Sequence, residues 1–309
     1  MRAVGIVRPD GYEAVQLIER PVPDPSRGEV RIAVAAAAVN PTDSGLRLAG
    51  GGDLPPPWTP GMDAAGVIDA LGEGVTRLRP GERVMAALTP RRPLGGAQAE
   101  FIVVPEASVV PIPDGATLQQ AATLPMNGLT AKLGLDALSL RAGQSLAVTG
   151  GAGLLASYVI ALGKEAGLRV IADAKPEDEG LVRSFGADVV VPRGEMLVAA
   201  VREAEREGVD GVFDTALLHE AVFGAMRDGG RIVVVRGWQP ESTERGIEVK
   251  AIMVSTVLER TDWLEQLRQS ASAGRLQLRV AAEYPPEQAA QAQRMMDAGG
   301  LRGRVVIVF

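Results

Sequence analysis

The sequence predicts an α/β fold, in which a doubly wound parallel sheet is joined to a second, β-rich part. Three observations lead to this prediction. Short strands punctuated by Pro and Gly fill roughly the first 120 residues. From Gln119 onward, short apolar strands alternate with helix-length segments. A glycine-rich turn at Gly150 joins one of these strands to a helix.

The N-terminal part is predicted to be a set of short strands. Alternation starting at Val30 predicts a strand that continues through small residues to Val39 and ends at Asn40-Pro41. Further strands are predicted at 67–68, 83–86 and 100–104. The Pro and Gly residues between them indicate turns rather than helices.

The second part is predicted to consist of βαβ units. Its apolar strands are expected at 145–148, 169–172, 189–191, 211–213 and 231–235. Strands separated by helix-length segments favour a parallel sheet with helices on its faces. From Asp262 the pattern predicts two more helices and a closing strand, 304–309.

The glycine-rich turn carries the clearest functional signal. The apolar strand before it, the turn and the helix after it place Gly151, Gly153 and Ala156 in the pattern G-x-G-x-x-A. Gly151 is expected to allow the tight turn, Gly153 the close approach of a pyrophosphate, and Ala156 the close packing of helix on strand. The helix N-terminus offers N–H groups to the phosphates. We therefore predict dinucleotide binding; a purely structural glycine-rich turn is the alternative.

The choice of cofactor depends on the end of the next strand. NAD enzymes place an acid there, about 20 residues after the turn, and Asp173 is near that place. Because side chains alternate along a strand, the one-residue offset is expected to point Asp173 away and to put Ala174 at the acidic position. Lys175 and Arg193 then meet a 2′-phosphate, which favours NADPH over NADH. The alternative is that both cations are solvated surface charges, since the acids at 177–179 oppose a phosphate.

Composition excludes several classes of function. The net charge of -6 gives no basic face for nucleic acid, and no stretch reaches the roughly 20 apolar residues of a membrane span. Asp10 and Glu13 interrupt any signal-peptide pattern, so we expect a cytoplasmic location. The chain has no cysteine, and its single histidine is His219. We therefore predict no bound metal.

Besides the glycine-rich turn, the chain carries short motifs at residues 39–43, 60–67, 80–84, 96–101, 121–131, 186–188 and 301–306. In their order and spacing, these motifs resemble those of the zinc-independent branch of the medium-chain dehydrogenase/reductase superfamily, close to quinone oxidoreductases and enoyl reductases. The resemblance covers nearly the whole chain.

The resemblance implies a division into two domains and a homodimer. A GroES-like catalytic domain of residues 1–122 and 257–309 is expected to enclose a Rossmann domain of residues 123–256. Zinc-dependent relatives carry a cysteine where Asn40 stands and Gly-His-Glu in place of residues 61–63, so the resemblance also implies no metal. Relatives often dimerise through an edge strand of the Rossmann sheet, and 231–235 is apolar enough to serve.

The resemblance implies further residues that line the cofactor, besides Ala174, Lys175 and Arg193. These are Asn40, Thr130, Gly151, Ala152, Gly153, Leu154, Leu155, Arg236, Gly237 and Val254. Two positions depart from the family pattern. Leu154 stands where many relatives have Gly, and Gly45 stands where related reductases often have a tyrosine, which some enoyl reductases use as a proton donor.

These features predict hydride transfer from the nicotinamide to a small molecule with a conjugated carbonyl, such as a quinone, an enone or an enoyl thioester. Such acceptors spread the developing charge without a metal. The Asn40 amide is the first candidate for a catalytic donor, and a cap at the strand end before Pro41 is the alternative role. Two other functions remain open, a metal-free alcohol or aldehyde dehydrogenase and a non-catalytic dinucleotide-binding or auxiliary protein.

Overall fold

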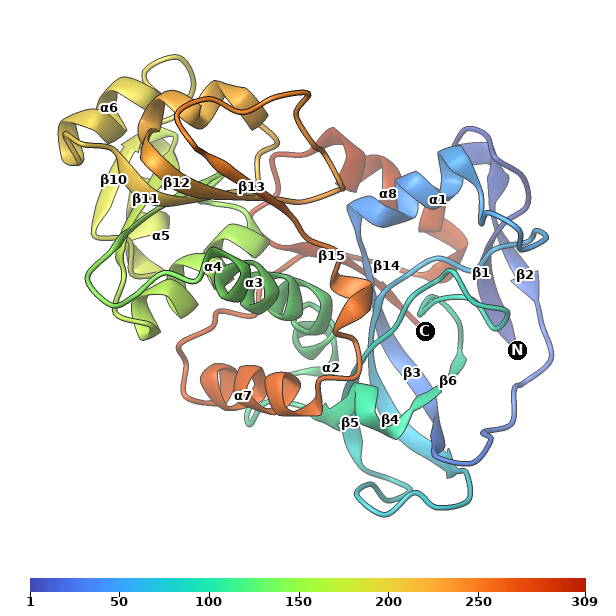
Figure 1. Cartoon of the computed structure of the whole chain (residues 1–309). Coiled ribbons are helices and arrows are strands. Elements are labelled where there is room, and N and C mark those ends of the chain that lie inside the picture. The colour runs from blue at the N-terminus through green and yellow to red at the C-terminus, as the bar shows by residue number, and fades with distance from the viewer. The chain divides into compact units, whose positions relative to one another are not determined.

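A computed structural model describes residues 1–309 and divides the chain into two compact units. The first unit comprises Met1–Met126, Val257–Gly274 and Leu278–Phe309, and the second comprises Asn127–Thr256 with Arg275–Gln277 (Figure 1). No helix combines the length and apolar character that crossing a bilayer demands.

The second unit is built on a six-stranded parallel sheet in the order β10-β9-β8-β11-β12-β13. Its strands are β8 (Ser145–Thr149), β9 (Arg169–Ala174), β10 (Val189–Pro192), β11 (Val209–Asp214), β12 (Met226–Val234) and β13 (Glu248–Ala251). The predicted α/β class with a doubly wound parallel sheet is confirmed.

Helices cover both faces of this sheet (Figure 1). On one face, α6 and the 3-10 helix η4 pack on Ala147, Val212 and Ile232. On the other, glycines of α3 and α4 allow close packing against Phe213 and Val170. Burial on both faces explains why these strands appear in the sequence as apolar runs. The helices of this unit are α3 (Pro125–Leu138), α4 (Leu154–Glu165), η3 (Pro176–Asp178), α5 (Glu179–Ser184), α6 (Leu197–Ala204), η4 (His219–Ala225) and η5 (Val254–Thr256).

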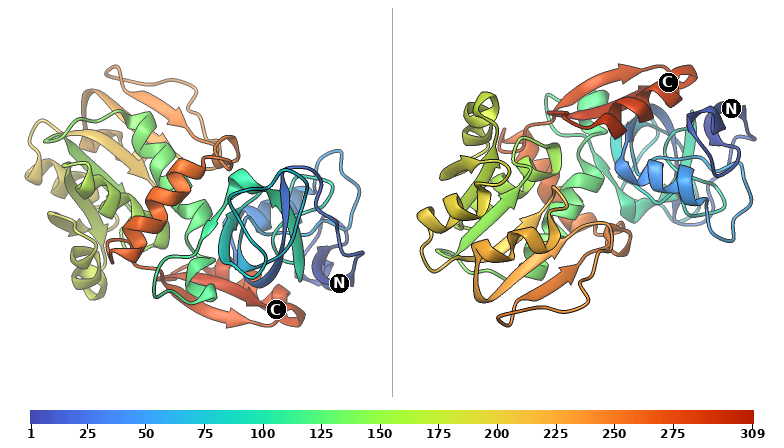
Figure 2. Two further views of the ribbon diagram at one scale, coloured as in Figure 1. Left: turned by 90° about the horizontal axis from the view of Figure 1, so that it is seen from below. Right: turned by 90° about the horizontal axis from the view of Figure 1, so that it is seen from above.

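The first unit is built on a mostly antiparallel sheet in the order β14-β15-β3-β4-β5-β7, with β6 also paired to β3 and with a separate β1-β2 hairpin. Both chain termini lie in this unit (Figure 2). Its strands are β1 (Arg2–Ile6), β2 (Val15–Glu19), β3 (Glu29–Val39), β4 (Asp63–Leu71), β5 (Arg83–Ala87), β6 (Phe101–Pro105), β7 (Val109–Pro111), β14 (Val280–Tyr284) and β15 (Arg304–Val308). Its helices are η1 (Tyr12–Ala14), α1 (Pro41–Ala49), η2 (Glu106–Ser108), α2 (Leu118–Ala121), α7 (Thr261–Ser272), η6 (Pro286–Gln288) and α8 (Ala289–Ala298).

The expected dimer strand, residues 231–235, is not an edge strand, so that expectation is wrong. β13 pairs in parallel with β12, with Arg231 opposite Glu248, and itself forms the edge. No strand was predicted at β13, because this segment, Glu-Val-Lys-Ala, is only four residues long and half of it is polar.

Gly45 lies inside α1, and a Cβ atom added there meets no heavy atom within 4 Å. We expect Gly45→Ala to raise the free energy of unfolding by about 0.5–1 kcal/mol, because glycine is a poor helix former. Urea denaturation measures this change. Gly134→Ala in α3 is the matched control: its Cβ overlaps the Phe213 ring, so it should destabilise the chain. A lower stability for Gly45→Ala would contradict the prediction.

Candidate functional site

The carboxyl ends of β8 and β11 form the switch point of the parallel sheet. From β8 the strand order proceeds through β9 and β10 on one side, and through β11 and β12 on the other. In doubly wound folds, ligands bind in the crevice at the carboxyl ends of the strands where the order reverses. The glycine-rich turn leaves β8 at this switch point, directly before α4.

Within the turn, the glycines have different roles from those expected. The left-handed residue is Gly150, with φ of 69°, and the Gly153 N–H closes the turn on the Gly150 carbonyl at 2.8 Å. Gly151 is required for another reason, because a Cβ there would lie 2.5 Å from the Asp173 carbonyl oxygen of β9. Gly153 is the N-cap residue of α4 and offers no capping side chain of its own.

Asp173 points at the turn, contrary to the expectation from strand alternation. Its Oδ1 accepts a hydrogen bond from the Gly151 N–H at 2.9 Å, and the residue is 1% exposed. Its Oδ2 is buried without a hydrogen-bond partner. Burial raises the pKa of Asp173, against the opposing effects of the Gly151 hydrogen bond and the charge of Arg193. A buried carboxylate therefore faces the turn with one oxygen still able to accept.

The predicted 2′-phosphate residues lie at the same edge, after β9 and β10. Arg193 has its Nε 3.9 Å from Asp173 Oδ2, and its backbone N–H donates to the Ala174 carbonyl at 3.2 Å. Lys175 is exposed, with its Nζ 3.9 Å from Glu177. The structure thus brings Ala174, Arg193 and the turn together around Asp173, while Lys175 has only a loose ion pair beside them.

The polar residues on the β11 side of the switch point were not predicted from the sequence. Thr149 Oγ1 donates to Asp214 Oδ1 at 2.6 Å and accepts from the Ala216 N–H at 3.0 Å. Thr215 lies against Gly150, where an added Cβ would be 3.0 Å from its Oγ1. A polar residue ending each of two apolar strands, Thr149 and Asp214, is the signal that could have located this loop.

The remaining predicted residues of the second unit are placed as follows. Arg236 and Gly237 follow β12, both with left-handed backbones (φ 65° and 73°). Thr130 is buried in α3, and Val254 begins η5. Ala152 and Leu155 are half-buried, and Leu154 is buried as the first residue of α4. Beyond β12, the Trp238 ring stacks on His219, with centroids 4.4 Å apart.

In the first unit, Asn40 belongs to a buried polar network. It follows β3 and precedes α1, whose Asp43 accepts a hydrogen bond from the Asn40 N–H at 2.9 Å. The Asn40 Nδ2 donates to Asp63 Oδ2 at 2.7 Å, and Gln98 Nε2 donates to Asp43 Oδ2 at 3.0 Å. All four residues are fully buried. The Asp43 side chain thus caps the Asn40 N–H at the start of α1, while the Asn40 amide nitrogen binds Asp63. Both the capping and the catalytic role of the Asn40 amide stay predictions.

Two carboxylates in this network titrate far from their ordinary range. Burial raises the pKa of Asp43 to about 7, against hydrogen bonds from the N–H groups of Asn40 and Gly61. Burial likewise raises the pKa of Asp63 to about 6, against hydrogen bonds from Met126 N–H and Asn40. Nowhere in the chain are three or more His, Cys, Asp or Glu side chains grouped so that they could hold a metal ion.

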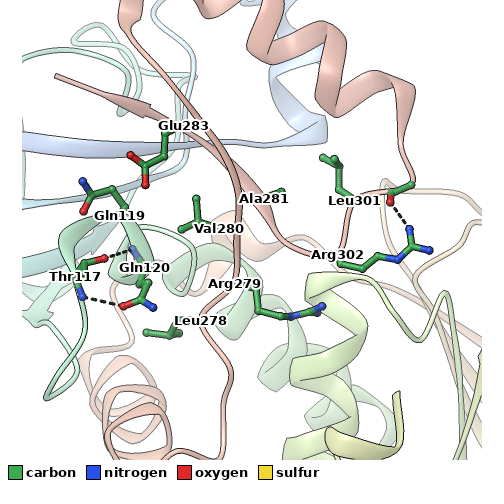
Figure 3. A pocket seen from close by; sticks show the side chains of 11 residues that line it. Thr117, Gln119, Gln120, Leu278, Arg279, Val280, Ala281, Glu283, Leu301 and Arg302 are labelled. Carbon is green, nitrogen blue, oxygen red and sulfur yellow. Dashed lines mark hydrogen bonds between the residues drawn. The ribbon is translucent and has the colours of Figure 1, made fainter. Parts of the chain in front are cut away.

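A separate pocket of about 820 Å³ lies in the first unit (Figure 3). The side chains of Arg279 and Arg302 lie on one side of it, and those of Glu283 and Gln119 lie on the other. Thr117 and Gln120 at its wall are joined by two hydrogen bonds, of 3.0 and 3.1 Å. None of the residues predicted from the sequence lines this pocket.

Known proteins resemble both units. Residues 26–114 match the family model of the alcohol dehydrogenase GroES-like domain, and residues 185–307 match that of zinc-binding dehydrogenase. The chain is 29% identical to the quinone oxidoreductase of Mus musculus, over 100% of this chain and 98% of that protein. It is 34% identical to the chloroplastic NADPH-dependent alkenal/one oxidoreductase of Arabidopsis thaliana, over 70% of this chain and 57% of that protein.

Solved structures share the fold over the full length. A structure of an NAD-dependent alcohol dehydrogenase matches with a TM-score of 0.87 and 30% identity, covering 100% of both chains. A mycobacterial protein complexed with NADPH matches with a TM-score of 0.88 and 25% identity, also covering 100% of both chains.

Proposed function

Because the chain belongs to the medium-chain dehydrogenase/reductase superfamily, we propose that it is an NADPH-dependent oxidoreductase that reduces a conjugated carbonyl compound without a metal. The observation that carries the proposal is the glycine-rich turn at the switch point of the parallel sheet. Relatives that include a quinone oxidoreductase and an NADPH-dependent alkenal/one oxidoreductase support the class of reaction.

The residues of the second unit fit a nicotinamide dinucleotide. The N-terminus of α4 and the turn from Gly150 to Gly153 suit a diphosphate, because backbone N–H groups and the helix dipole favour negative charge. The buried Asp173 Oδ2 lacks a donor, and a ribose hydroxyl is such a donor. Arg193 and Lys175 supply positive charge for a 2′-phosphate. The residues expected to hold the nucleotide are Asn40, Thr130, Gly151, Ala152, Gly153, Leu154, Leu155, Asp173, Ala174, Lys175, Arg193, Arg236, Gly237 and Val254.

When bound, the nicotinamide supplies the hydride, and the chain supplies binding, orientation and exclusion of water. A conjugated acceptor suits this chain because the charge developed on the carbonyl spreads into an enolate. Metal independence is supported by the absence of cysteine and by Asn40, whose amide nitrogen is bound to Asp63. Gly45 offers no acidic group, so the second proton comes from water or from another residue.

The proposal extends to the organisation of the protein. Residues 1–122 and 257–309 form the catalytic domain, and residues 123–256 form the dinucleotide domain. We propose a homodimer, for which β13 supplies an edge strand in place of 231–235. The cytoplasmic location stays a prediction.

A second candidate is a metal-free alcohol dehydrogenase that uses NAD. It is favoured by two observations, the full-length similarity to an NAD-dependent alcohol dehydrogenase and the buried Asp173 at the turn. A carboxylate there suits the ribose hydroxyls of NAD better than a phosphate.

The test monitors the absorbance of NADPH and of NADH as they are consumed in the presence of quinones, enones and enoyl thioesters. Simple alcohols are tested in the reverse direction, in which the oxidised nucleotide is reduced. We expect NADPH-dependent reduction of at least one conjugated acceptor by protein that elemental analysis shows to be free of zinc. Alcohol oxidation alone would favour the second candidate. Binding of NADPH without any turnover would favour a non-catalytic protein.

The cations after β9 and β10 give a sharper prediction. Arg193→Gln and Lys175→Gln are each expected to weaken NADPH binding by about five- to tenfold, because each removes a charged partner of the 2′-phosphate. Binding of NADH, which lacks that phosphate, should change by less than about twofold. Nucleotide fluorescence titration measures both. Equal losses for the two nucleotides would show that these cations do not recognise the 2′-phosphate.

A further inference from the structure

Two aromatic side chains of the second unit join loops that leave neighbouring strands of its parallel sheet. His219 follows β11, and Trp238 lies in the loop between β12 and β13. The two rings stack, with their centroids 4.4 Å apart and their planes 4° from parallel. Because β11 and β12 run in parallel, both loops leave the sheet at its carboxyl end. The stack therefore ties one of these loops to the other.

The His219 side of the stack is anchored to the strand that precedes the glycine-rich turn. The His219 N–H donates to Asp214 Oδ2 at 2.8 Å, and the other oxygen of Asp214 accepts from Thr149 Oγ1 at 2.6 Å. Asp214 is fully buried, and Thr149 is the last residue of β8. The backbone of His219 is thus fixed relative to the start of the turn.

Trp238 anchors an otherwise exposed part of its loop. Its neighbours Arg236, Gly237 and Gln239 are exposed, whereas Trp238 is half-buried. Its ring also lies edge-on to the buried Phe223, with centroids 6.5 Å apart. The position of the main chain at Arg236 and Gly237 therefore depends on where the Trp238 ring is held.

The backbone on both sides of the stack is strained. Leu217, His219 and Arg236 have φ of 59°, 56° and 65°, in a region that residues other than glycine rarely adopt. Such conformations persist only where surrounding contacts hold them, and they gather at active sites and ligand clamps. The stack and the hydrogen bond to Asp214 are contacts of this kind. This combination points to a role for the stack in ligand binding.

We infer that His219 and Trp238 are positioning residues, whose stack holds the main chain at Arg236 and Gly237 in place for the nicotinamide half of the nucleotide. This inference rests on the proposed function, in which those two residues line the cofactor. A doubly wound sheet binds one half of a dinucleotide on each side of its switch point. The residues proposed for the 2′-phosphate follow β9 and β10, so the nicotinamide half belongs on the side of β11 and β12.

The stack can be observed without any nucleotide, because His219 is the only histidine of the chain. Its ring protons give a single set of NMR signals, and the facing Trp238 ring shifts them to high field. We expect Trp238→Ala to move these signals back to the ordinary position. His219 signals at the ordinary position in the unmodified protein would overturn the inference.

His219→Ala tests the effect on binding, and His219→Phe is its matched control because a phenyl ring still stacks on Trp238. We expect His219→Ala to raise the Kd for NADPH by about three- to tenfold, and His219→Phe to raise it by less than about twofold. The Kd for 2′,5′-ADP, which lacks the nicotinamide half, should change by less than about twofold in both variants. Isothermal titration calorimetry measures both ligands.

A double-mutant cycle with Trp238→Ala shows whether the two rings act through one contact. If they do, the double variant with His219→Ala should bind NADPH about as well as Trp238→Ala alone. Should Trp238→Ala fail to fold, the two His219 variants decide the question by themselves.

Several results would overturn the inference. These are additive losses in the cycle, equal losses for NADPH and 2′,5′-ADP, an unchanged Kd for NADPH in His219→Ala, and a loss in His219→Phe as large as that in His219→Ala. Failure of the unmodified protein to bind either ligand would instead contradict the proposed function.

Discussion

Gly151→Val is expected to reduce nucleotide binding by at least about a hundredfold, because any side chain at this position collides with the backbone of the neighbouring strand. A Cβ atom at Gly151 lies 2.5 Å from the Asp173 carbonyl oxygen and 3.2 Å from the Ala172 Cβ. Backbone cannot move aside as a flexible side chain can. The turn must therefore separate from β9, which breaks the Gly151 hydrogen bond to Asp173 and displaces the N–H groups proposed to hold the diphosphate.

The measurement is the Kd for NADPH, combined with circular dichroism to show that the variant is folded. Overpacking of this kind lowers the free energy of unfolding by about 1–3 kcal/mol, so a measurable fraction of the variant should remain folded. Gly151→Ala is expected to give a smaller loss in the same direction. Gly180→Ala in α5, where an added Cβ meets nothing within 4 Å, should bind NADPH as the unmodified chain does. Unchanged binding in Gly151→Val would remove the turn from the site.

The second large effect is a fall in stability as the pH rises from about 4 to about 7. Asp43 and Asp63 are fully buried, and burial raises their pKa values to about 7 and about 6. In the unfolded chain both ionise near the ordinary aspartate value of about 4. The folded state therefore holds protons that the unfolded state releases. Unfolding releases protons in this window, so raising the pH favours it, by roughly 3–7 kcal/mol in total.

Urea denaturation at about pH 5 and about pH 8 measures the larger part of this change. Asp43→Asn removes one of the two titrating groups, so the difference in unfolding free energy between the two pH values should fall by about half or more, whatever the variant's absolute stability. Asp262→Asn is the control, because a hydrogen bond from Arg260 holds the pKa of Asp262 at about 2, outside the window. An equal unfolding free energy at both pH values would show that burial does not raise the pKa values of Asp43 and Asp63.

These two predictions differ in how much the sequence contributes to them. The strand, turn and helix around Gly150 could be predicted, because each is encoded by residues next to one another. The distinct roles of the glycines could not. That Gly150 is the left-handed residue, and that Gly151 faces the Asp173 carbonyl, depends on how β9 lies against β8.

The burial of Asp43 and Asp63 could not be predicted from the sequence. Asp43 and Asp63 are 20 positions apart in the sequence, and nothing in the local pattern of either predicts full burial. Each carboxylate accepts hydrogen bonds from groups outside its own element. Gln98 donates to Asp43, and Asn40 and Met126 donate to Asp63. Asp173 is a similar case, since alternation predicted that it points away from the turn that it in fact contacts.

The sequence by itself determined the α/β class, the family and the position of the dinucleotide turn, because apolar periodicity and closely spaced glycines are properties of consecutive residues. The tertiary structure alone decided that β13 rather than β12 forms the sheet edge, that Asp173 faces the turn, and that the Asn40 amide donates a hydrogen bond to Asp63. The physical reason is that pairing and side-chain direction at strand ends arise from contacts between distant segments. Their free energies appear only once the strands are packed together.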